Sequence, residues 1–99
     1  MHDAIDPGLE ERYWSTHFSS RPYVRPGAAY EAYRTAYRYG WESRGRYGEL
    51  NWEGVEPRLR EEWPTFRGDS TLDWDEASRA ARDAWERISP AADYRAENR

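Results

Sequence analysis

Large aromatic side chains recur along this chain at helical intervals, and charged residues fill the positions between them. One aromatic set repeats every 22 residues, and a second set follows the first by 11: Tyr30, Trp52 and Trp74, then Trp41, Trp63 and Trp85. Eleven residues make about three helical turns, so both rings of a pair lie on one helix face. Further apolar residues stand at spacings of three and four, which are typical of amphipathic helices and not of strands.

These spacings define four apolar stripes of similar layout. They are His2, Ile5, Leu9 and Tyr13; Tyr30, Tyr33, Tyr37 and Trp41; Trp52, Val55, Leu59 and Trp63; and Trp74, Ala77, Ala81, Trp85 and Ile88. The stripes predict helices near residues 3–18, 28–44, 52–64 and 73–89. The first and third segments share an early proline, and the second and fourth share their aromatic pairs. We therefore predict an all-α four-helix bundle made from a duplicated helical hairpin, with an aromatic Trp/Tyr core.

Capping and breaking residues support these boundaries. Asp73 and Glu76 have the spacing of a capping box, and Leu72 precedes them as a hydrophobic staple. Asn51 is a good N-cap for the third helix. The longest loop, 19–27, contains two prolines and is expected to be stiff, whereas the tail 90–99 is expected to be frayed.

The composition is unusual for a folded domain. Ile, Leu, Val and Phe together supply only 10 of 99 residues, a level that normally indicates disorder. Aromatic residues make up 16% and the net charge is only −4, so Trp and Tyr can replace the missing aliphatic core. We predict one domain, 1–99. Without cysteine, a signal segment or a long apolar run, we expect a cytoplasmic protein that does not enter a membrane.

Catalytic and metal-binding patterns are weak. His2 and His17 would lie about 22 Å apart on one helix, too far to share a metal ion. No Glu-x-x-His pair, nucleophile elbow or phosphate-binding loop occurs. The acidic pairs of the first and third helices are interpreted as solvated faces that pair with arginine: Glu10, Glu11, Glu61 and Glu62. We predict no enzymatic activity, no metal and no cofactor.

The segment 20–50 differs from the rest of the chain in charge. It has six arginines against three glutamates, a net of +3, while residues 1–19 sum to −3 and residues 51–99 to −4. Arg, Tyr and Trp are enriched at protein interfaces. We predict an interaction or scaffold module that binds a protein partner or a second copy of itself. The expected contact residues are Arg21, Tyr23, Arg25, Arg38, Tyr39, Arg44, Arg46 and Tyr47.

Two alternatives stay open. The same arginines and tyrosines of segment 20–50 suit single-stranded nucleic acid, although three of the tyrosines already belong to the predicted core stripe and the whole chain is acidic. Trp14, Tyr23, Tyr39 and Tyr47 fit none of the four stripes. They either form an exposed patch or cover the ends of the bundle.

The middle of the chain resembles a known bacterial family. Arg21-Pro22-Tyr23-Val24 and the stretch Tyr30-Glu31-Ala32-Tyr33-Arg34-Thr35-Ala36-Tyr37-Arg38-Tyr39-Gly40-Trp41 carry this resemblance, together with Trp63 and the Trp74–Trp85 segment. The family consists of uncharacterised proteins loosely associated with the general stress response. Thr35 departs from the proline of the family pattern. The resemblance implies a role in stress physiology and supplies no catalytic residues.

Overall fold

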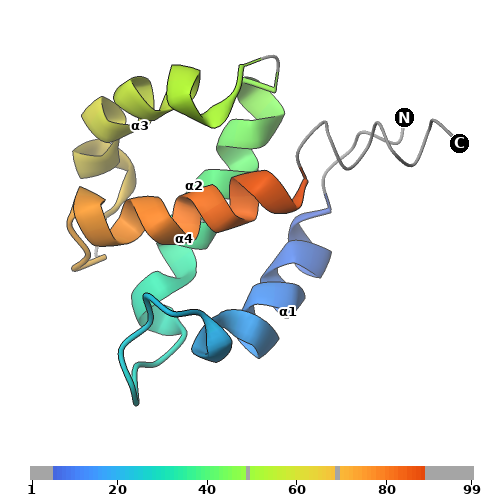
Figure 1. Ribbon diagram of the computed structural model, residues 1–99, viewed down its shortest axis with the longest axis vertical. Coiled ribbons are helices and arrows are strands. Elements are labelled where there is room, and N and C mark those ends of the chain that lie inside the picture. Colours follow the sequence, from blue (N-terminus) through green and yellow to red (C-terminus); the bar gives the residue numbers. More distant parts are fainter. Residues whose placement is uncertain (1–5, 49, 69, 89–99) are drawn as a thin grey trace, which may run out of the picture.

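The computed structural model describes residues 6–48, 50–68 and 70–88, and this part of the chain is helical without any strand. Its elements are α1 (Pro7–His17), a short 3₁₀ turn η1 (Phe18–Ser20), α2 (Glu31–Arg46), α3 (Trp52–Phe66) and α4 (Trp74–Arg87) (Figure 1). The predicted all-α class is therefore confirmed. Residues 3–5 of the first predicted helix and the predicted tail 90–99 lie outside the described residues.

Three helices begin at polar caps. The carboxylate of Asp6 accepts hydrogen bonds from the backbone of Gly8 at 3.0 Å and Leu9 at 3.2 Å. Asn51 and Asp73 cap α3 and α4 in the same way. Such caps satisfy backbone N–H groups that have no partner within the helix. At Asp73 only one half of the predicted capping box is seen, because the side chain of Glu76 pairs with Arg25 instead.

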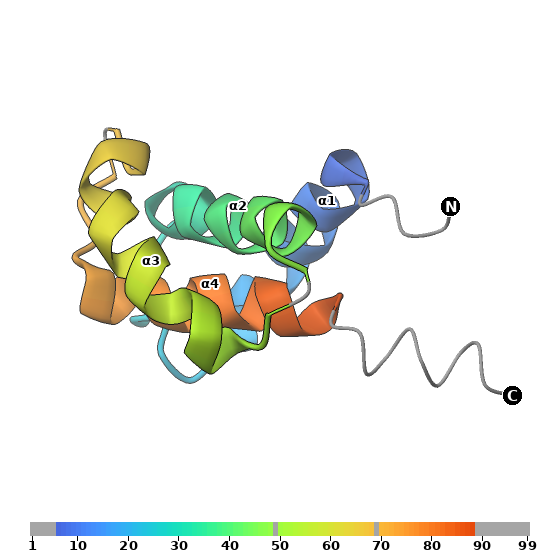
Figure 2. The ribbon, with the colours of Figure 1, turned by 90° about the horizontal axis from the view of Figure 1, so that it is seen from above.

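The centre of the fold is the crossing of α2 and α4. Figure 1 shows the two helices crossing, and Figure 2 shows them in separate layers. At the crossing, a Cβ on residue 40 would lie 2.9 Å from the Cα of Ala81 and closer still to its carbonyl oxygen. Gly40 therefore permits this backbone contact. Four fully buried alanines on α4 make the same approach possible: Ala77, Ala80, Ala81 and Ala84.

The outer helices α1 and α3 pack on α2 and α4 respectively. This is the arrangement expected of two hairpins. The stripe predicted for α3 is confirmed, since Trp52, Val55, Leu59 and Trp63 are all buried. The Trp63 indole donates to the carbonyl of Leu72 at 3.0 Å and so ties α3 to the start of α4. None of the helices in the described ranges is both long and apolar enough to cross a membrane.

The stripe predicted for α1 is wrong. Leu9 is 47% exposed, whereas Glu10 and Trp14 are buried. The buried face of α1 is shifted by one residue from the predicted stripe, because the Trp14 ring stacks on Tyr37 with ring centroids 4.5 Å apart. The buried Glu10 accepts a 2.9 Å hydrogen bond from Arg87 Nε, so it is not on the predicted solvated face. His2 and Ile5 lie outside the described residues.

Candidate functional site

Three of the eight expected contact residues bind α4 of their own chain. Arg21 donates two hydrogen bonds to Asp83, at 2.7 and 3.2 Å. The Tyr23 hydroxyl donates to the same carboxylate at 2.6 Å and lies 2.8 Å from the Tyr37 hydroxyl. Arg25 forms an ion pair with Glu76, which lies about two turns before Asp83 on α4. We call the four residues Arg21, Tyr23, Tyr37 and Asp83 the loop clasp, since they fasten the loop to the last helix.

Electrostatics favour one protonation state of the loop clasp. The hydrogen bond that Arg21 donates to Asp83 raises the pKa of the Arg21 guanidinium further above its usual value. Burial raises the pKa of Tyr23, and the hydrogen bond to Asp83 adds to this shift. Burial also raises the pKa of Tyr37 to about 12. At neutral pH the clasp therefore holds one arginine cation and two neutral phenols around the Asp83 side chain.

Tyr39, another of the expected contact residues, lies in the core. It is 0% exposed, and its hydroxyl donates a 2.8 Å hydrogen bond to the carbonyl oxygen of Leu59. Its ring stacks on Phe66 with centroids 4.4 Å apart. Trp14 is buried as well, while Tyr23 and Tyr47 are half-buried. The aromatics outside the predicted stripes therefore mostly complete the core.

The other four expected residues lie between the middle of α2 and its C-cap, Tyr47. The guanidinium groups of the three arginines stack on aromatic rings: Arg38 over Phe66 at 5.1 Å, Arg44 over Trp85 at 5.8 Å and Arg46 over Tyr47 at 5.4 Å. Arg58 of α3 covers the same Tyr47 ring at 5.3 Å. The exposed Arg46 and Arg58 thus both contact the half-buried Tyr47 ring at the corner where α2 leads into α3.

A groove of about 410 Å³ runs beside this corner, between α2 and α3. We call it the Phe66 groove; its lining residues are Tyr39, Arg46, Glu61, Glu62, Thr65 and Phe66. Phe66 is half-buried and supplies the apolar floor. No described residue lies within ion-pair distance of Arg46, Glu61 or Glu62, in contrast to Arg21 and Arg25. The groove thus combines an apolar floor with charged side chains that have no ion-pair partner among the described residues.

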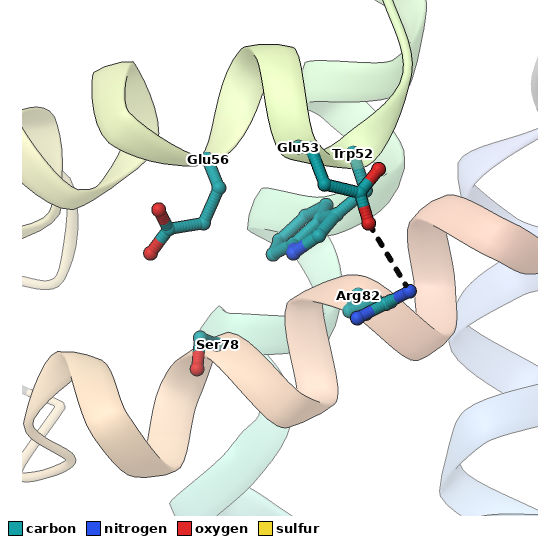
Figure 3. A pocket seen from close by; sticks show the side chains of 5 residues that line it. All are labelled: Trp52, Glu53, Glu56, Ser78 and Arg82. Carbon is teal, nitrogen blue, oxygen red and sulfur yellow. Dashed lines mark ion pairs between the residues drawn. The ribbon is translucent and has the colours of Figure 1, made fainter.

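A second groove, of about 320 Å³, lies on the other side of α3 (Figure 3). We call it the Trp52 groove, after the ring between its walls. Glu53 and Glu56 line it from α3, and Ser78 and Arg82 line it from α4. Glu53 and Arg82 form a loose ion pair of 3.7 Å. This groove is more polar than the Phe66 groove.

The sequence did not predict either groove. It predicted that α3 ends near Pro64, but the helix continues to Phe66, and the amide of Arg67 still donates to Trp63 O at 2.8 Å. Proline disturbs the helix at its own amide and at the carbonyl four residues earlier, but the amides that follow it can still donate, so the next turn can form. The helix thereby places Phe66 beside Tyr39. The signal for it was the interval of three residues between Trp63 and Phe66.

The histidine and several tyrosines of the described residues are engaged within the chain itself. Within the described ranges no group of three or more His, Asp or Glu side chains is placed to hold a metal ion. His17 stacks on Tyr13 and its Nδ1 lies 2.8 Å from the Tyr13 carbonyl oxygen. Bases need exposed rings to stack on, and Tyr33, Tyr37 and Tyr39 of the basic segment are buried.

No protein family, curated protein or solved structure matches the chain. The resemblance to stress-response proteins stays a prediction.

Proposed function

We propose that the chain is a non-enzymatic interaction module that binds a segment of a partner protein in the Phe66 groove. The observation that supports this proposal is the half-buried Phe66 ring beside Arg46, a cation without an ion-pair partner among the described residues. The two arginines of the loop before α2, Arg21 and Arg25, already form ion pairs with Asp83 and Glu76. An apolar ring next to an available guanidinium is the usual composition of an interface hot spot.

The chemistry of the groove defines the partner. An apolar side chain would cover Phe66, and a neighbouring carboxylate would form a charge-assisted hydrogen bond with Arg46. Arg58 and Tyr47 extend the same surface around the corner. Glu61 and Glu62 on the opposite side disfavour a uniformly acidic segment and favour one with charges of both signs. A function in the stress response, which the resemblance implies, would make the partner a protein of that response.

The test compares two groove variants with a surface control. Arg46→Glu reverses the charge, and Thr65→Arg places a bulky group at an exposed groove position. Arg12→Glu changes an exposed residue of α1 and serves as the control. Proteins captured from an extract of the native cells are identified, and the affinity of the specific one is then measured by titration. We expect both groove variants to bind at least about tenfold more weakly, roughly 1.4 kcal/mol, and the control to bind like the wild type.

Three outcomes distinguish the alternatives. Equal affinity of the wild type and both groove variants would refute the proposed site. A doubled mass in sedimentation that Thr65→Arg abolishes would identify the partner as a second copy of the chain. Retention on single-stranded DNA that falls steeply with salt would replace the proposal with nucleic-acid binding.

A further inference from the structure

Four tryptophans of α3 and α4 form one continuous row of rings with a tyrosine of α2. We call it the tryptophan row; its order is Tyr39, Trp63, Trp74, Trp52 and Trp85. The centroids of successive rings lie 5.3, 5.9, 6.4 and 5.9 Å apart, which are the separations of rings in contact. Indole and phenol rings give up a single electron readily, and electron transfer between touching rings is fast. An electron vacancy made on one ring can therefore move along the row.

Trp74 differs from the other rings in the hydrogen bond of its indole. Its N–H donates to Oε2 of Glu56 at 2.7 Å, whereas the Trp63 indole donates to the backbone carbonyl of Leu72. No second indole in the described part of the chain donates to a carboxylate. A carboxylate can take up a proton at neutral pH and a peptide carbonyl cannot. Trp74 is also half-buried, while the other rings of the row are buried, so reagents in solution can reach it.

Glu56 is ionised and held against the Trp74 indole. Arg60 donates to its other oxygen, Oε1, at 2.9 Å, which fixes the orientation of the carboxylate. The hydrogen bond from Trp74 lowers the pKa of Glu56 below its usual value, so the group is an anion at neutral pH. A negative charge this close stabilises a positive charge on the ring. Trp74 is therefore the tryptophan of the row that loses an electron most easily.

We infer that the tryptophan row carries oxidising equivalents out of the core, and that Trp74 paired with Glu56 is the site where they collect. The reactant is a one-electron oxidant in solution, which needs no binding pocket. A vacancy that would otherwise damage a buried ring is delivered to a ring that a reductant can reach. This chemistry uses the core rings and is independent of the Phe66 groove.

The step at Trp74 balances in electrons and protons. The oxidant accepts one electron from a ring of the row and is reduced, and successive rings pass the vacancy to Trp74. Loss of an electron makes the indole N–H far more acidic. The Nε1–H bond then breaks and its proton moves to Oε2 of Glu56, which leaves a neutral tryptophanyl radical and a carboxylic acid. A one-electron reductant restores the ring when Glu56 returns the proton.

The first experiment measures the proton transfer to Glu56. Tris(bipyridine)ruthenium(III), generated by a laser flash, oxidises the full chain, and transient absorption distinguishes the tryptophan cation radical from the neutral radical. A positioned proton acceptor contributes about 10²–10⁴-fold to such a step, so Glu56→Gln should slow formation of the neutral radical at least about a hundredfold. Glu53→Gln is the matched control. It removes the same charge from the same helix, but Figure 3 shows the Glu53 carboxylate on the other side of Trp52 from that of Glu56. Equal rates in the wild type and Glu56→Gln, or equal slowing by both variants, would overturn the inference.

The second experiment tests the row itself. The chain has no cysteine, so Glu86→Cys gives a single attachment site for a ruthenium photosensitiser at an exposed position beside Trp85. Vacancies injected there should produce the fast-forming neutral radical, and Trp74→Phe should abolish it. Trp52→Phe interrupts the row between Trp85 and Trp74 and should abolish it as well, whereas Trp14→Phe removes a buried tryptophan outside the row and should leave it unchanged. Circular dichroism checks that each variant is folded. An undiminished signal in folded Trp52→Phe would show that the row does not carry the vacancy.

Discussion

Replacing Gly40 with alanine tests the crossing of α2 and α4 most directly. The new Cβ would lie 2.9 Å from the Cα of Ala81, and backbone atoms cannot rotate away as a side chain can. The two helices would have to separate, and the core around Tyr37 and Trp41 would lose contacts with α4. The substitution therefore disturbs the largest helix–helix contact of the fold.

The magnitude follows from two opposing effects. Overpacking a close-packed interior costs about 1–3 kcal/mol, and a backbone clash belongs at the upper end of that range. Alanine gains about 1 kcal/mol over glycine inside a helix. We expect Gly40→Ala to lower the free energy of unfolding by about 2 kcal/mol, a considerable part of the 5–15 kcal/mol typical of a domain.

The assay is urea unfolding followed by tryptophan fluorescence, since several tryptophans are buried. The midpoint should fall while the slope stays constant, because the same surface is exposed on unfolding. Gly8→Ala is the control: its Cβ would meet Asp6 at an ordinary 3.5 Å, so the variant should be unchanged or up to about 1 kcal/mol more stable. If Gly40→Ala behaves like Gly8→Ala, the helices do not cross at this distance and the reasoning fails.

Two further perturbations test the core. Leu59 is 0% exposed and Leu9 is 47% exposed, so Leu59→Ala should cost about 2–5 kcal/mol of unfolding free energy and Leu9→Ala less than about 0.5 kcal/mol. Similar costs in urea unfolding would contradict the assigned face of α1. The pKa of Tyr37 is raised from 10.0 to about 12, so the unfolded chain ionises first, and its contribution to stability is complete below pH 10 and lost as the pH rises toward 12. Unfolding measured across this range should show a shallower loss for Tyr37→Phe, and an identical pH dependence in both proteins would exclude this linkage.

The helices could be predicted from the sequence because their rings repeat at helical intervals. The register of α1 could not. Leu9 occupies the same place in its segment as Leu59, but the ring contact between Trp14 and Tyr37 decides which face is buried, and that contact joins two helices. A local pattern does not contain this information.

The candidate site could be predicted only in part, for a similar reason. Arg21 and Tyr23 are residue types that are common at interfaces, but Asp83, about 60 positions away in the sequence, accepts their hydrogen bonds. Arg46 is of the same residue type as Arg21, but no described acidic residue lies close enough to form an ion pair with it. Residue type therefore identified candidates, and only long-range partners distinguish the committed arginines from the available one.

The position of α4 has a consequence for synthesis of the chain. Its residues bind Glu10 of α1, the loop through Asp83, and α3 through the Trp74 indole. The helix that leaves the ribosome after the other three is therefore the one on which they assemble. A nascent chain that stops before residue 74 lacks the packing and hydrogen bonds that α4 supplies to the other three helices, so we expect folding to be completed only after translation has passed α4.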